Sequence, residues 1–144
     1  MPSAGYEFLP HTTDAYIQTT GSTFEEALEY AGIALFDTMC EVEAISPDEV
    51  DNVQVTGADE VALLYNWLEA LLLKFELERK VYSRFKVILT KTPSNEFKIN
   101  AKIFGKKWTK EKQGAKVEVK AVTYHKMEIS HNVDGTTLRF ILDL

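Results

Sequence analysis

Apolar and polar residues alternate most regularly over residues 117–129, which predicts a half-buried strand around which the other elements are organised. One face of this strand would carry Val117, Val119, Ala121 and Thr123, and the other Glu118, Lys120, Val122 and Tyr124. β-Branched Val and Thr favour the pleated form over a helix. Lys120 has two interpretations: a charge that guards an edge strand against aggregation, or a cation held beside an anionic site.

Spacings of three and four between apolar positions predict two helices. The first begins at a capping box formed by Ser22 and Glu25 and continues to about Met39. The second follows Asp59, its N-cap, and ends near residue 74 or 78. Its apolar stripe is wide enough to predict burial on nearly every side, between two layers. This stripe comprises Val61, Leu63, Leu64, Trp67, Leu68, Leu71, Leu72, Leu73 and Phe75.

Shorter strands complete the predicted fold. They occupy residues 15–20, 50–56, 85–90, 97–104 and 138–144. The turn at 92–95 joins two of them in a hairpin, residues 6–10 form a lead-in, and the lysine-rich loop 108–114 is the predicted mobile segment. The element order predicts an α+β fold, with two helices packed on a mostly antiparallel β-sheet.

The chain has 144 residues, which is enough for one domain with a real core and too few for two. We expect a short N-terminal lead-in at residues 1–5 and a single compact domain at 6–144. Cys40 is the only cysteine, so no intramolecular disulfide can form, which favours a reducing compartment. The sequence has neither a signal segment nor an apolar run of about 20 residues, and we therefore expect a cytoplasmic protein without a membrane partner.

Charge is distributed unevenly along the chain. The net charge is −6, yet Lys74 is the first basic residue and residues 98–126 are rich in lysine. This asymmetry predicts two faces of opposite potential, although a solvated surface of uneven composition would give the same pattern. The overall acidity argues against nucleic-acid binding by this chain alone.

Carboxylates are the clearest candidates for chemistry. Asp14 lies at the entry to the first predicted strand, and Asp143 is followed by the α-carboxylate of Leu144. If the last strand ends beside the first, these groups would offer oxygen ligands to a hard cation such as calcium or magnesium. The alternative is that Asp14 caps a turn and Asp143 is simply solvated.

Other reaction classes have little support. The sequence contains no G-x-G-x-x-G, no G-x-x-x-x-G-K-[ST], no paired cysteines and no H-E-x-x-H. Cys40 and His125 could be imagined as a nucleophile and its base, but the position of Cys40 at a buried helix end predicts an inert thiol. His125 itself is typical of a strand-end histidine with a satisfied hydrogen bond.

Six segments, in this order along the chain, carry a family resemblance. They are residues 6–14 (Tyr-Glu-Phe-Leu-Pro-His-Thr-Thr-Asp), 21–27 (Gly-Ser-Thr-Phe-Glu-Glu-Ala), 34–39 (Ala-Leu-Phe-Asp-Thr-Met), 63–72 (Leu-Leu-Tyr-Asn-Trp-Leu-Glu-Ala-Leu-Leu), 118–125 (Glu-Val-Lys-Ala-Val-Thr-Tyr-His) and 141–144 (Ile-Leu-Asp-Leu). Together they make the sequence resemble the archease family over residues 6–144.

The resemblance implies a non-enzymatic protein, without catalytic residues, that activates the GTP-dependent RNA ligase of tRNA splicing. Such an activator would promote transfer of GMP to the ligase's active-site histidine and so allow repeated turnover. Its partner would be the ligase, and it would reach tRNA only indirectly, through that ligase.

The resemblance also implies a site. Asp14, Asp143 and Leu144 match the family positions that bind a divalent cation, commonly calcium, with magnesium or manganese as alternatives. Lys120 matches a lysine near that site that is implicated in ligase activation, where it would face a phosphate. His11, Tyr124 and His125 are expected to surround these groups without binding the cation.

Two positions depart from the family pattern. Pro10 stands where many members carry an acid before the histidine, and Ser22 stands where Asp or Glu is common. The loss of two acids near the site predicts weaker cation affinity, because nearby charge tunes it.

The alternative function is that of a general chaperone or a small enzyme that uses His125 or Tyr124.

Overall fold

The structure is a computed structural model that describes residues 4–11 and 13–144. Its strands are β1 (Gly5–Leu9), β2 (Ala15–Gly21), β3 (Glu49–Gly57), β4 (Lys80–Lys91), β5 (Phe97–Lys107), β6 (Ala121–Asn132) and β7 (Gly135–Asp143). Its helices are α1 (Phe24–Met39), α2 (Glu60–Glu78), the short α3 (Lys110–Gln113) and the 3-10 turn η1 (Val42–Ala44). This confirms the predicted α+β fold.

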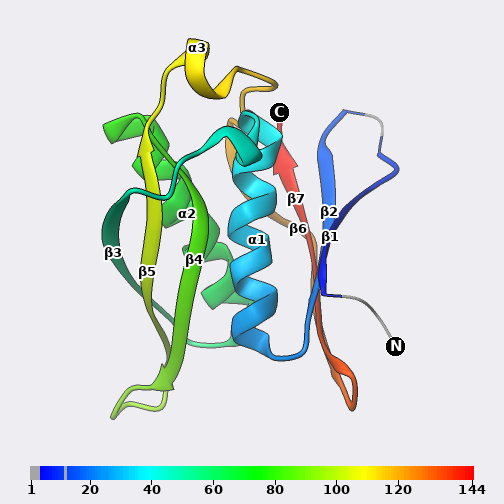
Figure 1. Ribbon diagram of the computed structural model, residues 1–144. Helices are drawn as coiled ribbons and strands as arrows, with labels where there is room; N and C mark the ends of the chain where they lie inside the picture. Colours follow the sequence, from blue (N-terminus) through cyan, green and yellow to red (C-terminus); the bar gives the residue numbers. More distant parts are fainter. Residues whose placement is uncertain (1–3, 12) are drawn as a thin grey trace.

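The strands form two antiparallel sheets rather than one. The four-stranded sheet has the order β1-β2-β7-β6, and the three-stranded sheet has the order β3-β5-β4. Figure 1 shows α1 and α2 lying between these sheets, so that the molecule has a sheet, a helical layer and a second sheet. The expectation of one sheet was wrong because alternation along a strand gives its buried face but not its sheet.

The helical layer contains most of the apolar core. Leu64, Trp67, Leu68 and Leu71 of α2 are fully buried, which agrees with the wide stripe expected for a helix between two layers. The Trp67 indole Nε1 donates a hydrogen bond to the Leu28 carbonyl of α1 at 2.9 Å, which links the two helices. Leu73, by contrast, is 42% exposed and was wrongly included in the buried stripe.

One edge of the three-stranded sheet is closed by helix α1. The backbone N–H of Val87 donates to the Glu29 carboxylate at 2.9 Å, and that of Leu89 donates to Glu25 at 3.4 Å. These N–H groups lie on the side of β4 that has no neighbouring strand. An open edge is a site of aggregation, and two carboxylates of α1 satisfy it here.

The N-cap of the first helix lies one residue after the predicted one. The N-cap of α1 is Thr23, whose Oγ1 accepts from the Glu26 N–H at 3.1 Å, and the Glu26 carboxylate accepts from the Ser22 N–H at 2.8 Å. The expected pairing of Ser22 with Glu25 was therefore displaced by one position. Asp59 caps α2 as predicted, accepting from the Ala62 N–H at 2.8 Å.

Several strand boundaries also differ from the prediction. Residues 6–10 belong largely to β1, which pairs with β2, and Gly5 of the expected lead-in is already in that strand. Strand β4 begins at Lys80, five residues before the expected start at Phe85, because Arg79 adopts a left-handed conformation (φ 52°) that ends α2 and reverses the chain. Residues 1–3 and Thr12 lie outside the described residues.

The organising strand itself is shifted. Strand β6 covers 121–132 rather than 117–129, and its pairing with β7 is interrupted between Thr123 and Glu128. Val119 and Val122 are buried whereas Ala121 is exposed, so the expected face of alternate residues does not exist. The first four residues of the predicted strand leave the ladder and cross the end of α1.

Trp67 provides a test of the helical layer. Trp67→Ala should lower the free energy of unfolding by about 3–5 kcal/mol, because it leaves a cavity and removes the bond to Leu28. Urea denaturation with a fixed slope would measure this. Leu77→Ala, at a side chain that is 78% exposed, is the control and should change stability by no more than about 0.5 kcal/mol. Equal effects of the two changes would contradict this account of the core.

Candidate metal site at the end of the four-stranded sheet

The register of the four-stranded sheet brings Asp14, Asp143 and Leu144 to one end of the sheet. Ala15 of β2 pairs with Leu142 of β7, so Asp14 stands one step beyond this pair, opposite Asp143. The Asp14 Oδ1 accepts from the Leu144 N–H at 3.5 Å, at the outer limit for a hydrogen bond. Two carboxylate side chains and the last residue of the sequence therefore share one corner.

Lys120 reaches the same corner from the other side of β7. Its N–H donates to the Asp143 carbonyl at 2.7 Å, just before the β6–β7 ladder begins with the pair Ala121 and Asp143. Among the described residues, no carboxylate lies within ion-pair distance of the Lys120 ammonium. The lysine is exposed, so its charge is available to a group from outside the chain.

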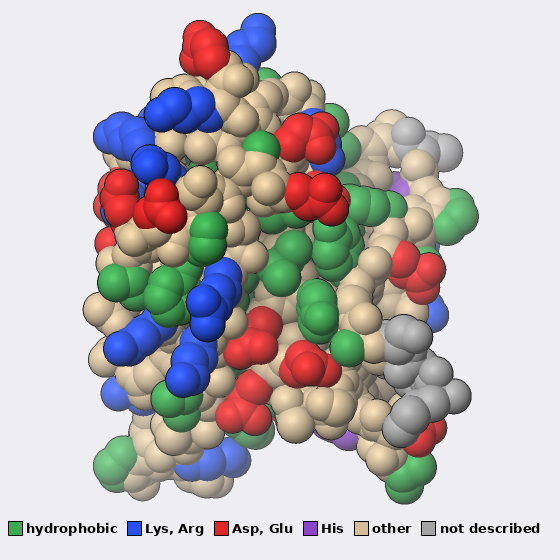
Figure 2. Space-filling model, viewed as in Figure 1, with side chains coloured by type: hydrophobic (Ala, Val, Ile, Leu, Met, Phe, Trp, Pro, Cys, Tyr) green, Lys and Arg blue, Asp and Glu red, His purple; other side chains and the backbone are tan. Residues whose placement is uncertain are grey.

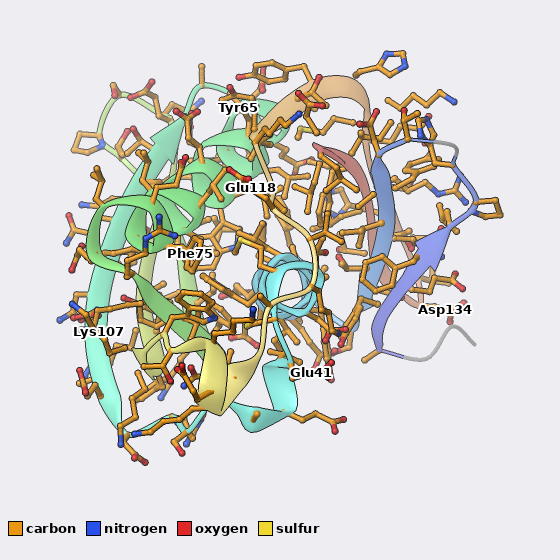
Figure 3. All side chains as sticks on the ribbon, turned by 90° about the horizontal axis from the view of Figure 1, so that it is seen from above. Glu41, Tyr65, Phe75, Lys107, Glu118 and Asp134 are labelled. Carbon is orange, nitrogen blue, oxygen red and sulfur yellow. The ribbon has the colours of Figure 1, made fainter. Side chains whose placement is uncertain are left out.

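The segment 114–120 carries Lys120 to this position. It leaves α3 at Gly114, whose φ of +76° is easily adopted by glycine. The Lys116 N–H then donates to the Met39 carbonyl at 2.9 Å, and the Val117 N–H to the Thr38 carbonyl at 3.3 Å. Figure 3, which looks down on this end of the molecule, shows the segment passing over the end of α1. The last carbonyls of α1, which lack helical partners, are thus used to hold the segment.

Side chains fix the same segment. The Lys116 ammonium donates to the Asp37 carboxylate of α1 at 3.0 Å, and the Tyr6 hydroxyl of β1 donates to the other oxygen of Asp37 at 3.0 Å. Burial, followed by the hydrogen bond to Asp37, raises the pKa of Tyr6 to about 12. The hydrogen bond to Asp37 is also the main cause that raises the pKa of Lys116. Asp37 therefore ties β1, α1 and the segment together.

The three residues expected around the ligands are placed differently. The His11 ring makes an edge contact with Tyr16, with ring centroids 6.0 Å apart. The Tyr124 ring is stacked on the Tyr65 ring of α2, with the ring centroids 4.2 Å apart and an angle of 6° between the ring planes. It therefore packs against the helical layer. The His125 side chain is exposed, and its N–H donates to the Thr123 Oγ1 at 3.1 Å. Of the three, Tyr124 is held by a contact that has no relation to the carboxylates.

Ser22 is far from this corner. It follows the end of β2, whereas Asp14 precedes its start, and the seven residues of β2 lie between them. At about 3.3 Å per residue, they are roughly 25 Å apart. Ser22 was therefore wrongly counted among residues near the site, and only Pro10 stays as a departure close to it in the chain.

The donor set suits a hard cation. Two aspartate carboxylates and the main chain of Leu144 would supply oxygen ligands, which calcium, magnesium and manganese prefer. Within residues 4–11 and 13–144, no group of three or more His, Cys, Asp and Glu side chains is arranged to hold a metal ion. A cation here would accordingly depend on Leu144 and on water or a partner's oxygens for its remaining ligands.

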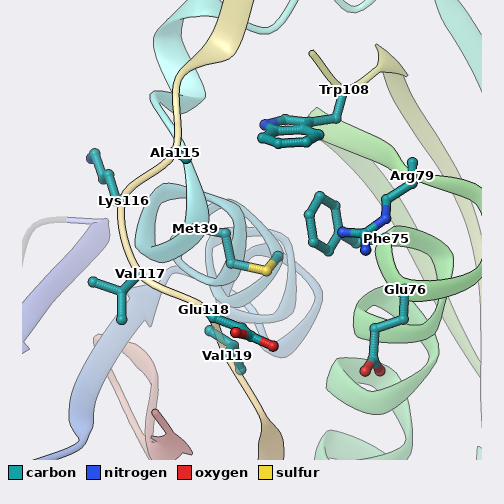
Figure 4. A pocket seen from close by; sticks show the side chains of 10 residues that line it. All are labelled: Met39, Phe75, Glu76, Arg79, Trp108, Ala115, Lys116, Val117, Glu118 and Val119. Carbon is teal, nitrogen blue, oxygen red and sulfur yellow. The ribbon is translucent and has the colours of Figure 1, made fainter. Parts of the chain in front are cut away.

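A pocket that the sequence did not reveal adjoins the candidate site. It has a volume of about 410 Å³ and is lined by Met39, Phe75, Glu76, Arg79, Trp108, Ala115, Lys116, Val117, Glu118 and Val119. Figure 4 shows the Trp108 and Phe75 rings on one side and Glu118 opposite Glu76. Val119 precedes Lys120, so the pocket wall continues into the candidate site. Its residues come from separate elements, and no spacing pattern along the chain could have identified them.

The loop 108–114, predicted to be mobile, has regular structure and internal contacts. It contains α3, its Gln113 side chain is buried, and the Trp108 Nε1 donates to the Gly114 carbonyl at 2.9 Å.

Cys40, expected to be inert, is fully buried, and burial raises the pKa of its thiol to about 11. A thiol with this pKa is a poor nucleophile near neutral pH.

Comparison with known proteins shows which family this chain belongs to. Its fold and site are those of an antiparallel α+β domain with two aspartates at one end of its four-stranded sheet. The sequence matches the Archease protein family over residues 6–144. It is 42% identical to protein archease of Pyrococcus abyssi over 130 residues, which cover 90% of this chain and 91% of that protein. It is 34% identical to protein archease of Methanosarcina barkeri over 146 residues, with both chains fully covered.

A solved structure agrees with these matches. The solution structure of Methanobacterium thermoautotrophicum protein 1598 superposes with a TM-score of 0.84 at 32% identity, and the match covers 97% of this chain and 99% of that one. The chain belongs to the archease family, as the resemblance of its motifs indicated. At the level of the family, this membership supports a protein-cofactor role in tRNA splicing and points to a non-catalytic protein.

No helix in the described part of the chain is long and apolar enough to cross a membrane.

The link through Asp37 predicts a loss of stability at alkaline pH. Folding raises the pKa of Tyr6 from 10.0 to about 12, so its contribution is present below pH 10 and is lost as pH rises from about 10 towards 12. Urea denaturation at pH 8 and pH 11 should show a smaller loss for Tyr6→Phe than for the parent chain. Lys116 acts in the same direction, so the loss should shrink rather than vanish. An identical loss in both proteins would contradict the prediction.

Proposed function

We propose that this protein activates the GTP-dependent RNA ligase of tRNA splicing and is not itself an enzyme. Family membership supports the tRNA-splicing role, and the corner formed by Asp14, Asp143, Leu144 and Lys120 supports the particular mode of action. The observation that carries the proposal is the strand register that sets Asp14 opposite Asp143, with the Asp14 carboxylate bonded to the Leu144 N–H and the Lys120 backbone bonded to Asp143. The proposed result is faster guanylylation of the ligase's active-site histidine and therefore repeated turnover.

The corner offers two chemical functions to such a partner. Asp14, Asp143 and Leu144 would hold a divalent cation, with calcium as the first candidate. When bound, this cation supplies positive charge that can neutralise phosphate oxygens. The Lys120 ammonium, which is exposed and lacks an ion-pair partner in the described chain, would address a phosphate of the nucleotide that is transferred.

Rigidity supports this assignment. The segment that carries Lys120 is held by two backbone hydrogen bonds to α1 and by the Lys116–Asp37 ion pair. These contacts fix the backbone from which the Lys120 side chain extends and so limit the region that its ammonium can reach, which favours a defined position for the charge when a partner binds. The alternative of a small enzyme that uses Tyr124 or His125 has less support, because the Tyr124 ring is engaged in a stack with Tyr65.

Calcium binding tests the carboxylate corner. In isothermal titration with calcium, the parent chain should bind one ion, and Asp143→Asn should bind it at least tenfold more weakly, because one anionic ligand is lost. Asp134→Asn, in the turn before β7 at the other end of the sheet, removes the same charge and should leave binding unchanged. Equal binding by all three proteins, or none by the parent, would refute the proposed site.

Lys120→Ala tests the proposed activation. Multiple-turnover ligation by the partner ligase, at limiting GTP, should be stimulated at least tenfold less by this variant, which corresponds to about 1.4 kcal/mol of transition-state stabilisation. Folding should be spared, since an exposed lysine contributes about 0–1 kcal/mol. Lys110→Ala, on α3, is the control and should stimulate as the parent does.

Two results would reject this assignment. Full stimulation by a folded Lys120→Ala variant would return Lys120 to the role of an edge-strand guard. Ligation or guanylylation by this chain in the absence of the ligase would reject the non-enzymatic cofactor role altogether.

A further inference from the structure

The outer face of the three-stranded sheet carries an ordered array of basic and amide side chains. Strand register aligns its outward residues in rows across β3, β5 and β4. The rows are Val50–Phe104–Arg84, Asn52–Lys102–Lys86, Gln54–Asn100–Ile88 and Thr56–Lys98–Thr90. None of these positions is acidic. We refer to these four rows as the basic sheet face.

Two lysines oppose each other directly on this face. Lys86 of β4 pairs with Lys102 of β5, and both side chains are exposed. Like charges opposite each other across strands are destabilising. Among the described residues, neither lysine forms an ion pair. Glu29 of α1 is near enough to interact with the Lys86 charge but is not bonded to it. An anion from outside the chain that contacts both ammonium groups would relieve the repulsion between them.

Neutral hydrogen-bonding groups adjoin these lysines. A hollow of about 410 Å³ on this face is lined by Asn52, Val53, Gln54, Lys86, Ile88, Asn100, Ala101 and Lys102. Its three amide side chains can each donate and accept, which matches the mixed edges of nucleobases. The hollow therefore combines cations for a phosphate with amides for a base.

A stacking surface lies at one end of the rows. The Arg84 guanidinium carbon is 5.1 Å from the centre of the Phe104 ring, and Arg84 is exposed. Unpaired bases stack on aromatic rings and on the planes of arginine guanidinium groups. Val50, which is 51% exposed, lies in the same row as Phe104 and adds an apolar group to this surface.

The acidic residues near this sheet lie outside the four rows. Three of them, at one end of the sheet, form ion pairs with Lys80 and Lys106. Figure 2 shows lysine and arginine side chains over the three-stranded sheet, on the left, with acidic side chains beside them near its upper end and others over the lower half of α1. Glu25 and Glu29 of α1 are held by N–H groups at the edge of β4. The net charge of −6 is thus compatible with a local positive potential, because exposed charges beyond about 8–10 Å are screened in physiological salt.

We propose that the basic sheet face binds an unpaired RNA strand directly, with its phosphates on Lys86, Lys98 and Lys102 and a base against Arg84 and Phe104. This differs from the expectation that RNA is reached only through the ligase. The choice of this face as the binding surface is based on its own pattern of charged and amide side chains. Only the choice of RNA over DNA rests on the proposed function.

The composition of the face favours RNA over an acidic protein. The cores of protein–protein interfaces are depleted in lysine and enriched in tyrosine, tryptophan and arginine. Here three lysines and three amides dominate a face with a single aromatic ring, Phe104. Stacking surfaces beside a line of cations are typical of single-strand binders.

The test measures RNA binding without the ligase, so that its result is independent of ligase activation. Fluorescence anisotropy would follow a labelled 12-nucleotide single-stranded RNA at 50 mM and 200 mM salt. We expect binding by the parent chain, and at least tenfold weaker binding by the double variant Lys86→Gln/Lys102→Gln. Losing two phosphate contacts should also lower the slope of log affinity against log salt by about 1.4.

Matched controls make the result specific to this face. Lys110→Gln/Lys112→Gln on α3 removes the same charge from another surface and should bind RNA as the parent does. Thermal unfolding of the Lys86/Lys102 double variant should be unchanged or shifted upwards, because the repulsion is removed. Absence of RNA binding at 50 mM salt, or equal weakening by both double variants, would overturn the proposal. Tighter binding of poly-glutamate than of RNA, or equal binding of single-stranded DNA, would also overturn it.

Discussion

Burial of two helices between two small sheets is the constraint on which the rest of this structure depends. Neither sheet could bury a face alone, and α2 has apolar groups on more than one side. Placing the helices in the middle gives each sheet one buried face, which packs on α1 and α2, and one solvent-exposed face. The exposed faces and the sheet ends can then carry polar groups, and both proposed binding surfaces lie there.

The end of α1 connects this core to the candidate site. A helix leaves its last carbonyls without helical partners, and here those of Thr38 and Met39 accept from the segment that delivers Lys120. Asp37 adds an ion pair and a hydrogen bond to the same region. The site therefore lies where the start of β2, the end of β7 and the segment 114–120 meet. The buried helix α1 fixes the position of that segment. The neighbouring pocket, closed by Trp108 and Phe75, belongs to the same arrangement.

Charge separates the surface of the protein into regions with different chemistry. Carboxylates converge at the end of the four-stranded sheet, whereas lysines and amides cover the outer face of the three-stranded sheet. A protein that assists RNA joining could use both, one towards a nucleotide and a cation and the other towards the RNA strand. The two regions come from different sheets, so substitutions in one should leave the other intact.

The two helices, Asp59 as a cap, the β4–β5 hairpin and the family could all be predicted from the sequence, because they depend on local periodicity, capping and ordered motifs. The sequence also proposed Asp14, Asp143 and Lys120 as site residues, through segments that match the family pattern. Only the tertiary structure decided that the strands form two sheets, that residues 117–120 leave the strand, and that Tyr124 stacks on Tyr65. The reason is physical: alternation gives the buried face of a strand, whereas its partner and register depend on contacts between residues far apart in the chain.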